Sequence, residues 1–218
     1  YLKELSNKLI SYQTKIHHLC REKFLEKMEY YDNKYSSALK EITEFVAEID
    51  VIKSIAKTSI LYAYTKPIIQ ESENSFIIAK SLRHPIIERI NDCYNYVPND
   101  IAIGGEETNG ILLFGTNASG KSSLMKGIGL NIILAQAGFF VACKELRFNP
   151  YKHLFTRINN NDNIFKGESS FAVEMGELRS ILKRSNSRSL VLGDELCSGT
   201  ENISALAIFS SSVIKLCE

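Results

Sequence analysis

One octapeptide stands out in this chain: Gly115-Thr116-Asn117-Ala118-Ser119-Gly120-Lys121-Ser122. It follows the apolar run 111–114, which we expect to form a strand. It precedes apolar residues at helical spacing, namely Leu124, Met125, Ile128 and Ile132. A strand, a glycine-bearing turn and a helix in that order are the context that a phosphate-binding P-loop requires. Glycines permit the tight turn, and the N–H groups at a helix start attract anions.

This octapeptide therefore predicts a triphosphate site. Lys121 would reach the β- and γ-phosphates, and the Ser122 hydroxyl would ligate Mg²⁺. Residues 189–195, which read Ser-Leu-Val-Leu-Gly-Asp-Glu, are a short apolar strand that ends in two carboxylates. In P-loop ATPases an aspartate at this place helps to hold Mg²⁺, so we expect this of Asp194. The adjacent Glu195 could orient and deprotonate the attacking water.

Composition bounds the class of protein. The chain has 218 residues, of which 44% are hydrophobic and 23% charged, which indicates one or two globular domains. The net charge of +1 gives no compositional sign of a nucleic-acid partner. No apolar run reaches the roughly 20 residues of a membrane span, and the start lacks the apolar core of a signal peptide. Because the chain begins inside a helical pattern and without methionine, we expect an N-terminally truncated fragment.

Cysteine usage predicts an intracellular protein with reduced thiols, because the count is odd and the residues are scattered. None forms a C-x-x-C pair, so a zinc site is not indicated. The five are Cys20, Cys93, Cys143, Cys197 and Cys217.

The N-terminal part reads as long helices. Apolar residues recur at alternating spacings of three and four, as in a helical arm or coiled coil. They are Leu2, Leu5, Leu9, Tyr12, Ile16 and Leu19. Residues 29–34, rich in Tyr, Asp and Asn, are a candidate interruption, after which a second long helix continues to about residue 60. We expect Pro67 to end it. The predicted domains are a helical lever or clamp segment, 1–67, and a P-loop domain, 68–218.

The second part alternates strand and helix signals, which predicts an α/β fold. Residues 76–79, 101–103 and 154–158 read as strands, 83–85 as a turn, and 91–100 and 159–167 as polar loops. A helix should open within 169–175, with Ser169 or Ser170 as its N-cap.

At this point the chain resembles the MutS family of DNA mismatch-repair ATPases. Residues 82–88 are similar to that family's R-H-P-V-V-E segment, and 115–123 to its G-P-N-M-G-G-K-S-T loop. Further similarities follow in order: 134–141 to L-A-Q-x-G-x-F-V, 155–158 to F-T-R-I, 169–175 to S-T-F-M-V-E-M, and 190–200 to V-L-x-D-E-x-x-x-G-T. Residues 48–51 resemble A-x-x-D-V, where the lever helix returns.

The resemblance implies an ABC-type P-loop ATPase domain, incomplete at its C-terminus and preceded by lever or clamp helices. Glu195 and Lys121 would be catalytic, and Ser122 and Asp194 would hold Mg²⁺. Tyr96 would stack on adenine, although an ordinary loop tyrosine is an equal alternative, and Ser169 and Ser170 would act on the partner's nucleotide. Phosphates would be bound by Gly115, Thr116, Asn117, Ala118, Ser119, Gly120, Lys121, Ser122 and Ser123. His84, in a turn, would be structural.

The chain departs from the family pattern at several positions, but Lys121 and Ser122 are kept. The positions of the loop that depart from the pattern are Thr116, Ala118, Ser119 and Ser123. Glu168, Cys197 and Ser198 depart near the subunit interface of the family, which weakens the expectation of coupling between sites. The family's switch histidine, dimerisation helices and mismatch-reading domain would lie outside this sequence.

The implied function is ATP hydrolysis that closes a clamp on mismatched or structured double-stranded DNA, in a homodimer or a heterodimer with a paralogue, with ATP and Mg²⁺ and away from membranes. Nucleus, nucleoid, organelle and viral factory are not distinguished. One alternative is a coiled-coil ABC-type ATPase of chromosome maintenance or recombination. Its signature loop would read Ser-Gly-Gly, whereas residues 167–171 read Gly-Glu-Ser-Ser-Phe. Another is a DNA scaffold that binds ATP without turnover.

Overall fold

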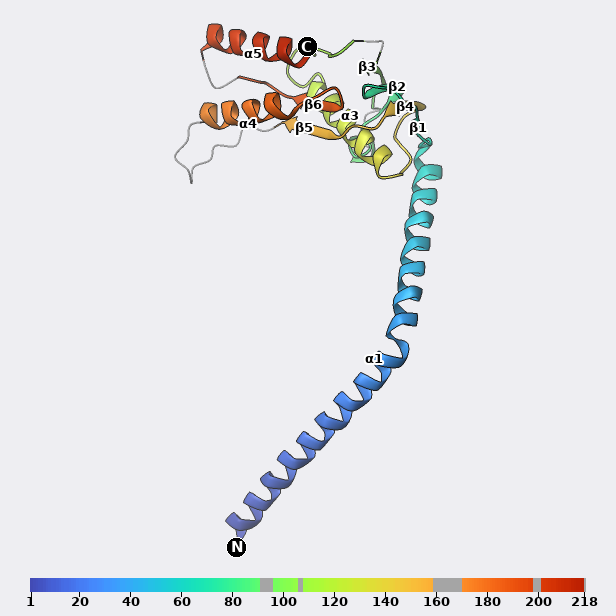
Figure 1. Ribbon diagram of the computed structural model, residues 1–218, viewed down its shortest axis with the longest axis vertical. Helices are drawn as coiled ribbons and strands as arrows, with labels where there is room; N and C mark the ends of the chain where they lie inside the picture. The colour runs from blue at the N-terminus through green and yellow to red at the C-terminus, as the bar shows by residue number, and fades with distance from the viewer. Residues whose placement is uncertain (91–95, 106–107, 159–169, 198–200, 218) are drawn as a thin grey trace. The chain divides into compact units, whose positions relative to one another are not determined.

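The computed structural model describes residues 1–90, 96–105, 108–158, 170–197 and 201–217 (Figure 1). It divides into two compact units, Tyr1–Ser54 and Ile55–Glu218. The first unit consists of helix, since α1 spans Leu2–Tyr62 and continues into the second unit. In the part of the chain so described, none of the helices combines the length and hydropathy that crossing a bilayer demands.

The expected interruption of the first helix at residues 29–34 is wrong, because α1 is continuous there. The segment contains neither glycine nor proline, and Tyr, Asp and Asn each cost only a fraction of a kcal/mol in a helix. The Lys34 ammonium donates a hydrogen bond of 3.0 Å to the Tyr30 hydroxyl one turn earlier, a spacing that helix favours. Polar composition alone therefore did not break the helix.

Helix α1 ends at Tyr62, five residues before the proline that was expected to end it. Ala63 adopts a left-handed backbone with φ 50°, which stops the helical repeat. The Arg83 guanidinium donates to the carbonyl oxygens of Tyr62 (3.2 Å) and Ala63 (3.1 Å), which have no helical partner. The helix is thus ended by a tertiary contact within the second unit.

The larger sheet has the strand order β1-β4-β2-β3. Its members are β1 (Ile68–Ile69), β4 (Glu145–Asn149), β2 (Phe76–Leu82) and β3 (Asn99–Gly104). β1 and β4 are parallel, while β2 is antiparallel to both of its neighbours, with Ile77 opposite Phe148 and Ile103. The sequence pattern predicted β2 and β3, but it missed β1 and β4. The loop expected over 91–100 gives its last two residues to β3, and 91–95 lie outside the described residues.

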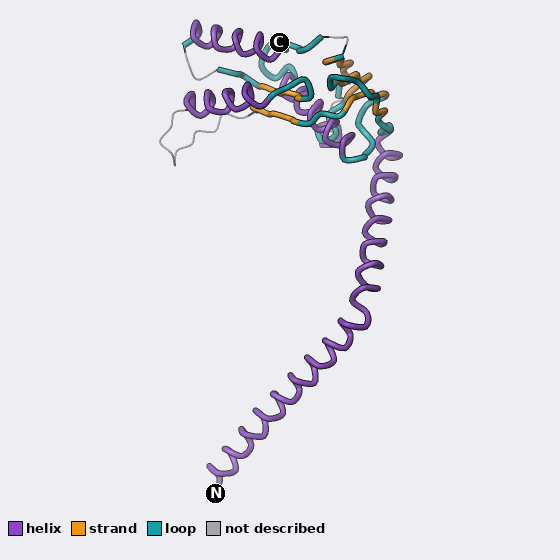
Figure 2. Tube along the Cα trace, viewed as in Figure 1, coloured by secondary structure: helices purple, strands orange, loops and turns teal. Residues whose placement is uncertain are grey.

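The smaller sheet pairs β5 (His153–Arg157) with β6 (Ser189–Gly193) in parallel. The sequence predicted a strand at 154–158 and one directly before Asp194, but not their pairing. Helix α4 (Ser170–Arg184) connects these two strands and contacts α5 (Asn202–Cys217), which the sequence analysis missed (Figure 2). A one-turn helix, α2 (Ile87–Ile90), was also missed. The predicted loop at 159–167 lies outside the described residues.

Helix α3 (Lys121–Gln136) joins the two sheets into one core. Its buried apolar residues pack both against β2 and β4 and against Leu190 and Leu192 of β6. The helix contains the four apolar residues, Leu124 to Ile132, whose spacing predicted it, and Gly138 lies just beyond its end at φ 82°. The core therefore holds the start of α3 in a fixed relation to the end of β6.

The strand expected at 111–114 is wrong. The run is irregular and exposed, and the Phe114 side chain is 91% exposed. Four apolar residues indicate a preference for burial, but a strand also needs a neighbour that accepts its backbone hydrogen bonds. In the described ranges, β5 is the strand that pairs with β6, and no ladder includes 111–114.

Candidate functional site

The loop before α3 places free backbone donors at the start of that helix. Gly120 is the N-cap residue, in the left-handed region at φ 91°, and no side chain caps the helix there. A helix N-terminus without a cap leaves N–H groups that attract an anion. Ala118 is also left-handed, at φ 62°, so the loop turns tightly just before the helix.

The Lys121 ammonium folds back onto this loop. It donates hydrogen bonds of 2.8 Å to the carbonyl oxygens of Gly115 and Thr116. Both bonds are exposed, so replacing them with bonds from the ammonium to the oxygen atoms of an anion carries little net cost in free energy. The lysine is therefore held at the mouth of the loop and remains available to an anion.

The two acids follow the end of β6. The Asp194 N–H donates to the Arg157 carbonyl oxygen at 2.8 Å, which extends the β5–β6 pairing past Gly193. Glu195 then turns sharply, with a left-handed φ of 48°. The chain leaves the sheet at this point and presents both side chains together.

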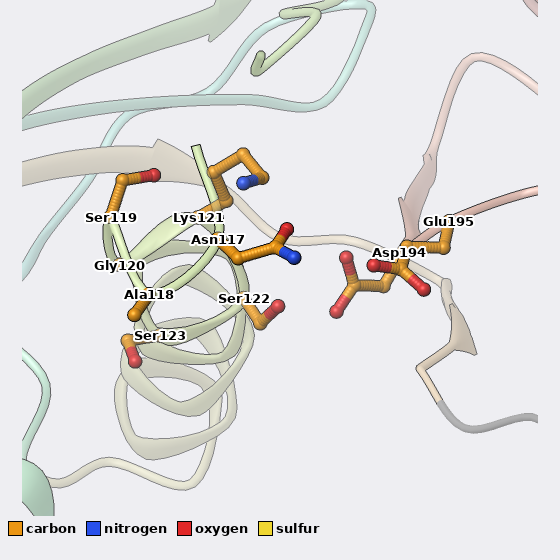
Figure 3. A pocket seen from close by; sticks show the side chains of 9 residues that line it. All are labelled: Asn117, Ala118, Ser119, Gly120, Lys121, Ser122, Ser123, Asp194 and Glu195. Atoms are coloured by element: carbon orange, nitrogen blue, oxygen red, sulfur yellow. The ribbon is translucent and has the colours of Figure 1, made fainter. Parts of the chain in front are cut away.

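The loop and the acids line a single pocket of about 390 Å³. Its lining residues are Asn117, Ala118, Ser119, Gly120, Lys121, Ser122, Ser123, Asp194 and Glu195. Figure 3 shows the side chains of Asn117 and Ser122 directed toward the two carboxylates, while the Ser123 side chain is directed away from them. The two stretches that the sequence singled out, more than 70 residues apart, thus meet at one place.

Glycine at position 129 lies where α3 packs against β6. A Cβ atom built on Gly129 would lie 2.8 Å from Cδ1 of Leu192 in β6, closer than real atoms approach. A side chain at position 129 would therefore require the Leu192 side chain or the helix to shift. Ser122 and Asp194 lie at the ends of these same two elements.

The donor set suits a hard divalent cation and a phosphate chain. A serine hydroxyl and an aspartate carboxylate are oxygen ligands of the kind that Mg²⁺ prefers, when substrate phosphates complete the shell. In the described part of the chain no group of three or more His, Cys, Asp or Glu residues could hold a metal by itself. A cation here would need oxygen atoms from a bound phosphate.

Other predicted site residues lie elsewhere or cannot be located. Tyr96 is half-buried and is not one of the residues that line this pocket. Its burial, and secondarily the nearby Glu88 charge, raise the pKa of its hydroxyl. Ser169 and the Ser170 side chain lie outside the described residues, although α4 does begin at Ser170.

His84 has the structural part expected of it. Its Nδ1 accepts hydrogen bonds from the N–H groups of Ile86 (3.2 Å) and Ile87 (3.1 Å), and only 4% of the residue is exposed. Burial lowers the pKa of its imidazole, which favours the neutral ring that can accept these bonds.

Sequence reasoning missed the residues that support the acids from behind. The carboxylate of Glu174 in α4 accepts a bond of 2.6 Å from the Cys197 N–H, just after the acids. Burial, and then the charge of Glu174, raise the pKa of the Cys197 thiol. Glu174 belongs to the segment 169–175 that resembles S-T-F-M-V-E-M, but no local pattern shows what it contacts.

Comparison with known proteins adds the family. The family model described as MutS domain V matches residues 111–218, which include the loop and both acids. Relatives match most of this chain. The DNA mismatch repair protein mutS homolog of Acanthamoeba polyphaga mimivirus is 42% identical over 100% of this chain and 22% of its own length.

Two further relatives come from distant organisms. The mitochondrial DNA mismatch repair protein mutS homolog of Sarcophyton glaucum is 38% identical, over 84% of this chain and 19% of its own. The DNA mismatch repair protein MutS of Thermotoga petrophila is 37% identical, over 95% of this chain and 25% of its own. The chain therefore spans about a fifth to a quarter of the length of these relatives. With the loop, the acids and these similarities taken together, the chain belongs to the MutS family.

Proposed function

We propose that this chain is the ATP-hydrolysing part of a mismatch-repair protein, with a segment of the helical lever or clamp at residues 1–67. ATP hydrolysis would drive closure of a clamp on mismatched or structured double-stranded DNA. The observation that carries the proposal is the pocket that Lys121, Ser122, Asp194 and Glu195 line together. The names of the relatives support the repair role, and the protein would act inside the cell.

Each residue has a role that its position supports. The loop 115–120 and the uncapped start of α3 would bind the phosphates through backbone N–H groups. Lys121 would exchange its two loop carbonyls for the β- and γ-phosphates. Ser122 and Asp194 would hold Mg²⁺, which when bound neutralises charge on the phosphates. Glu195 would orient the attacking water and accept its proton.

Two subunits would meet through these units, as homodimer or paralogue heterodimer. Ser169 and Ser170 would face the nucleotide of the partner, since α4 begins at Ser170 and a helix N-terminus suits a γ-phosphate. Tyr96 would stack on adenine from outside the pocket that the loop and the acids form.

The test separates binding from hydrolysis in the full-length protein. Glu195→Gln should leave nucleotide affinity intact and lower kcat by about 10²–10³-fold, because a positioned general base contributes about that much. Lys121→Ala should abolish detectable nucleotide binding. Affinity is measured with a fluorescent ATP analogue and kcat by phosphate release.

The opposite results are equally informative. If wild type and Glu195→Gln hydrolyse ATP equally slowly while DNA binding persists, the protein is an ATP-binding scaffold. If ATP with Mg²⁺ does not bind the wild-type protein at all, the proposed function is wrong.

A further inference from the structure

Glu174 is a buried acid with a specific partner. Only 3% of the residue is exposed, and its Oε1 accepts the Cys197 N–H at 2.6 Å. Glutamate is seldom fully buried unless it is paired, and a hydrogen bond from a backbone N–H to a carboxylate is stronger than one between neutral groups. The bond joins α4 to the turn that follows Asp194 and Glu195.

That turn has a backbone that needs support. Glu195 and Cys197 are both left-handed, at φ 48° and 66°, although neither is glycine. Left-handed non-glycine residues each cost on the order of 1–2 kcal/mol, and such conformations persist only when surrounding contacts impose them. The Cys197 N–H that Glu174 binds belongs to one of these two residues, so the hydrogen bond acts where the backbone is under strain.

A second contact from α4 reaches the same place. Glu177, one turn after Glu174, forms an ion pair of 3.0 Å with the Arg157 guanidinium. The Arg157 carbonyl oxygen accepts the Asp194 N–H at 2.8 Å. Two carboxylates spaced three residues apart on α4 therefore support the turn, one directly and one through Arg157.

We propose that Glu174 is a positioning residue for Glu195: by holding the Cys197 N–H it fixes the turn that aims the Glu195 carboxylate into the pocket. This inference rests on the proposed function, in which Glu195 accepts a proton from water. A general base works only within hydrogen-bond reach of that water, and a displacement of about 1 Å can cost on the order of 10²-fold in rate. Glu174 is not one of the residues that line the pocket, so it would act through the turn.

The same hydrogen bond connects the turn that carries Glu195 to helix α4. The helix begins at Ser170, which the proposed function sets against the nucleotide of the partner subunit. A shift of α4 along its axis would therefore reach the Glu195 turn through the bond between Glu174 and Cys197.

Two substitutions at this position test the role in the full-length protein. Glu174→Ala removes the acceptor, whereas Glu174→Gln keeps an oxygen at the same place and so can still accept the Cys197 N–H. Arg179→Ala, at an exposed position of the same helix, is the matched control. For each variant we would measure kcat, KM, affinity for a fluorescent ATP analogue, and hydrogen exchange of the peptide that contains residues 194–197.

Glu174→Ala should lower kcat about tenfold or more, with KM and nucleotide affinity changed less than about twofold. Exchange at residues 194–197 should accelerate, while exchange in β2 stays as in wild type. Glu174→Gln should restore most of kcat and most of the protection, and Arg179→Ala should match wild type.

Three results would overturn the inference: a folded Glu174→Ala protein with wild-type kcat, a Glu174→Gln protein as slow as Glu174→Ala, or a loss of nucleotide affinity that matches the loss of kcat. A wild-type protein that binds but does not hydrolyse ATP would refute the proposed function instead. The hydrogen-exchange comparison would then still decide whether Glu174 holds the turn.

Discussion

The four-stranded sheet and the loop that leads into α3 differ in how far they bury an aromatic side chain. Phe148, in β4, is completely buried in the core, whereas Phe114, just before the loop, is 91% exposed. Residues around the sheet are fixed by packing, and residues around the pocket by short turns and hydrogen bonds. The difference teaches that stability and chemistry depend on separate sets of residues in this unit, which meet along α3.

The largest expected effect tests this comparison with a matched pair of substitutions. Phe148→Ala should lower the free energy of unfolding by about 3–5 kcal/mol, because it removes buried apolar surface and leaves a cavity. Phe114→Ala should change it by less than about 0.5 kcal/mol, since the side chain is already in solvent. Urea denaturation of both variants measures these values. Equal losses in the two variants would contradict the comparison.

An intermediate effect is expected from Asn131, a fully buried polar residue in α3. Its side chain donates to the Arg83 carbonyl oxygen at 3.0 Å and accepts the Ala142 N–H at 2.7 Å. Asn131→Ala leaves the buried Ala142 N–H without its partner, at a cost of about 1–3 kcal/mol, whereas the Arg83 carbonyl oxygen is only partly buried and can bond to water. The expected loss is therefore smaller than that of Phe148→Ala, and thermal denaturation measures it.

The control for this substitution lies two residues further along. Ile133→Ala removes a larger side chain from the same helix, but 52% of that residue is exposed. If Ile133→Ala destabilised the protein more than Asn131→Ala, hydrogen bonding would not be what joins α3 to the segments around Arg83 and Ala142.

The smallest expected effect concerns pH, through His84. Burial lowers the pKa of its imidazole from 6.5. Below that value the unfolded chain therefore binds more protons than the folded one. The contribution of the neutral His84 ring to the free energy of unfolding is fully present above pH 6.5, and it is lost as pH falls through the lower pKa of the folded state. We expect the free energy of unfolding to decrease as pH falls below 6.5, and we expect His84→Asn to remove this part of the pH dependence.

Asparagine suits this test because its Oδ1 can accept the N–H groups of Ile86 and Ile87 without titrating. The measurement is urea denaturation of both proteins at each pH. An identical pH dependence in wild type and His84→Asn would show that other groups account for it.

Local pattern predicted the elements that carry the pocket. The apolar residues at helical spacing in α3 predict a helix, and the apolar run of β6 predicts a strand, each from a few neighbouring residues. The glycines before α3 indicate the turn between the loop and the helix. The strand β1 has only two residues and exists through its pairing with β4, so no local signal could reveal it. The error at 111–114 has the same origin, because apolar composition does not reveal which segment supplies a hydrogen-bonding neighbour.

The sequence predicted the residues that line the candidate site, but it did not predict the contacts that hold the turn after Asp194 and Glu195. Lys121, Ser122, Asp194 and Glu195 carry chemistry that can be read from residue type and order. The link from Glu174 to Cys197 joins residues 23 positions apart in the chain. It depends on how α4 returns to the sheet, which is a tertiary fact.

The close approach of Gly129 to Leu192 has a consequence for engineering. Replacing Gly129 by alanine would place a methyl group against Cδ1 of Leu192, so either that side chain turns aside or α3 moves slightly away from β6. Neither residue lines the pocket, so a variant at either position could alter how α3 packs against β6 without changing a residue of the pocket.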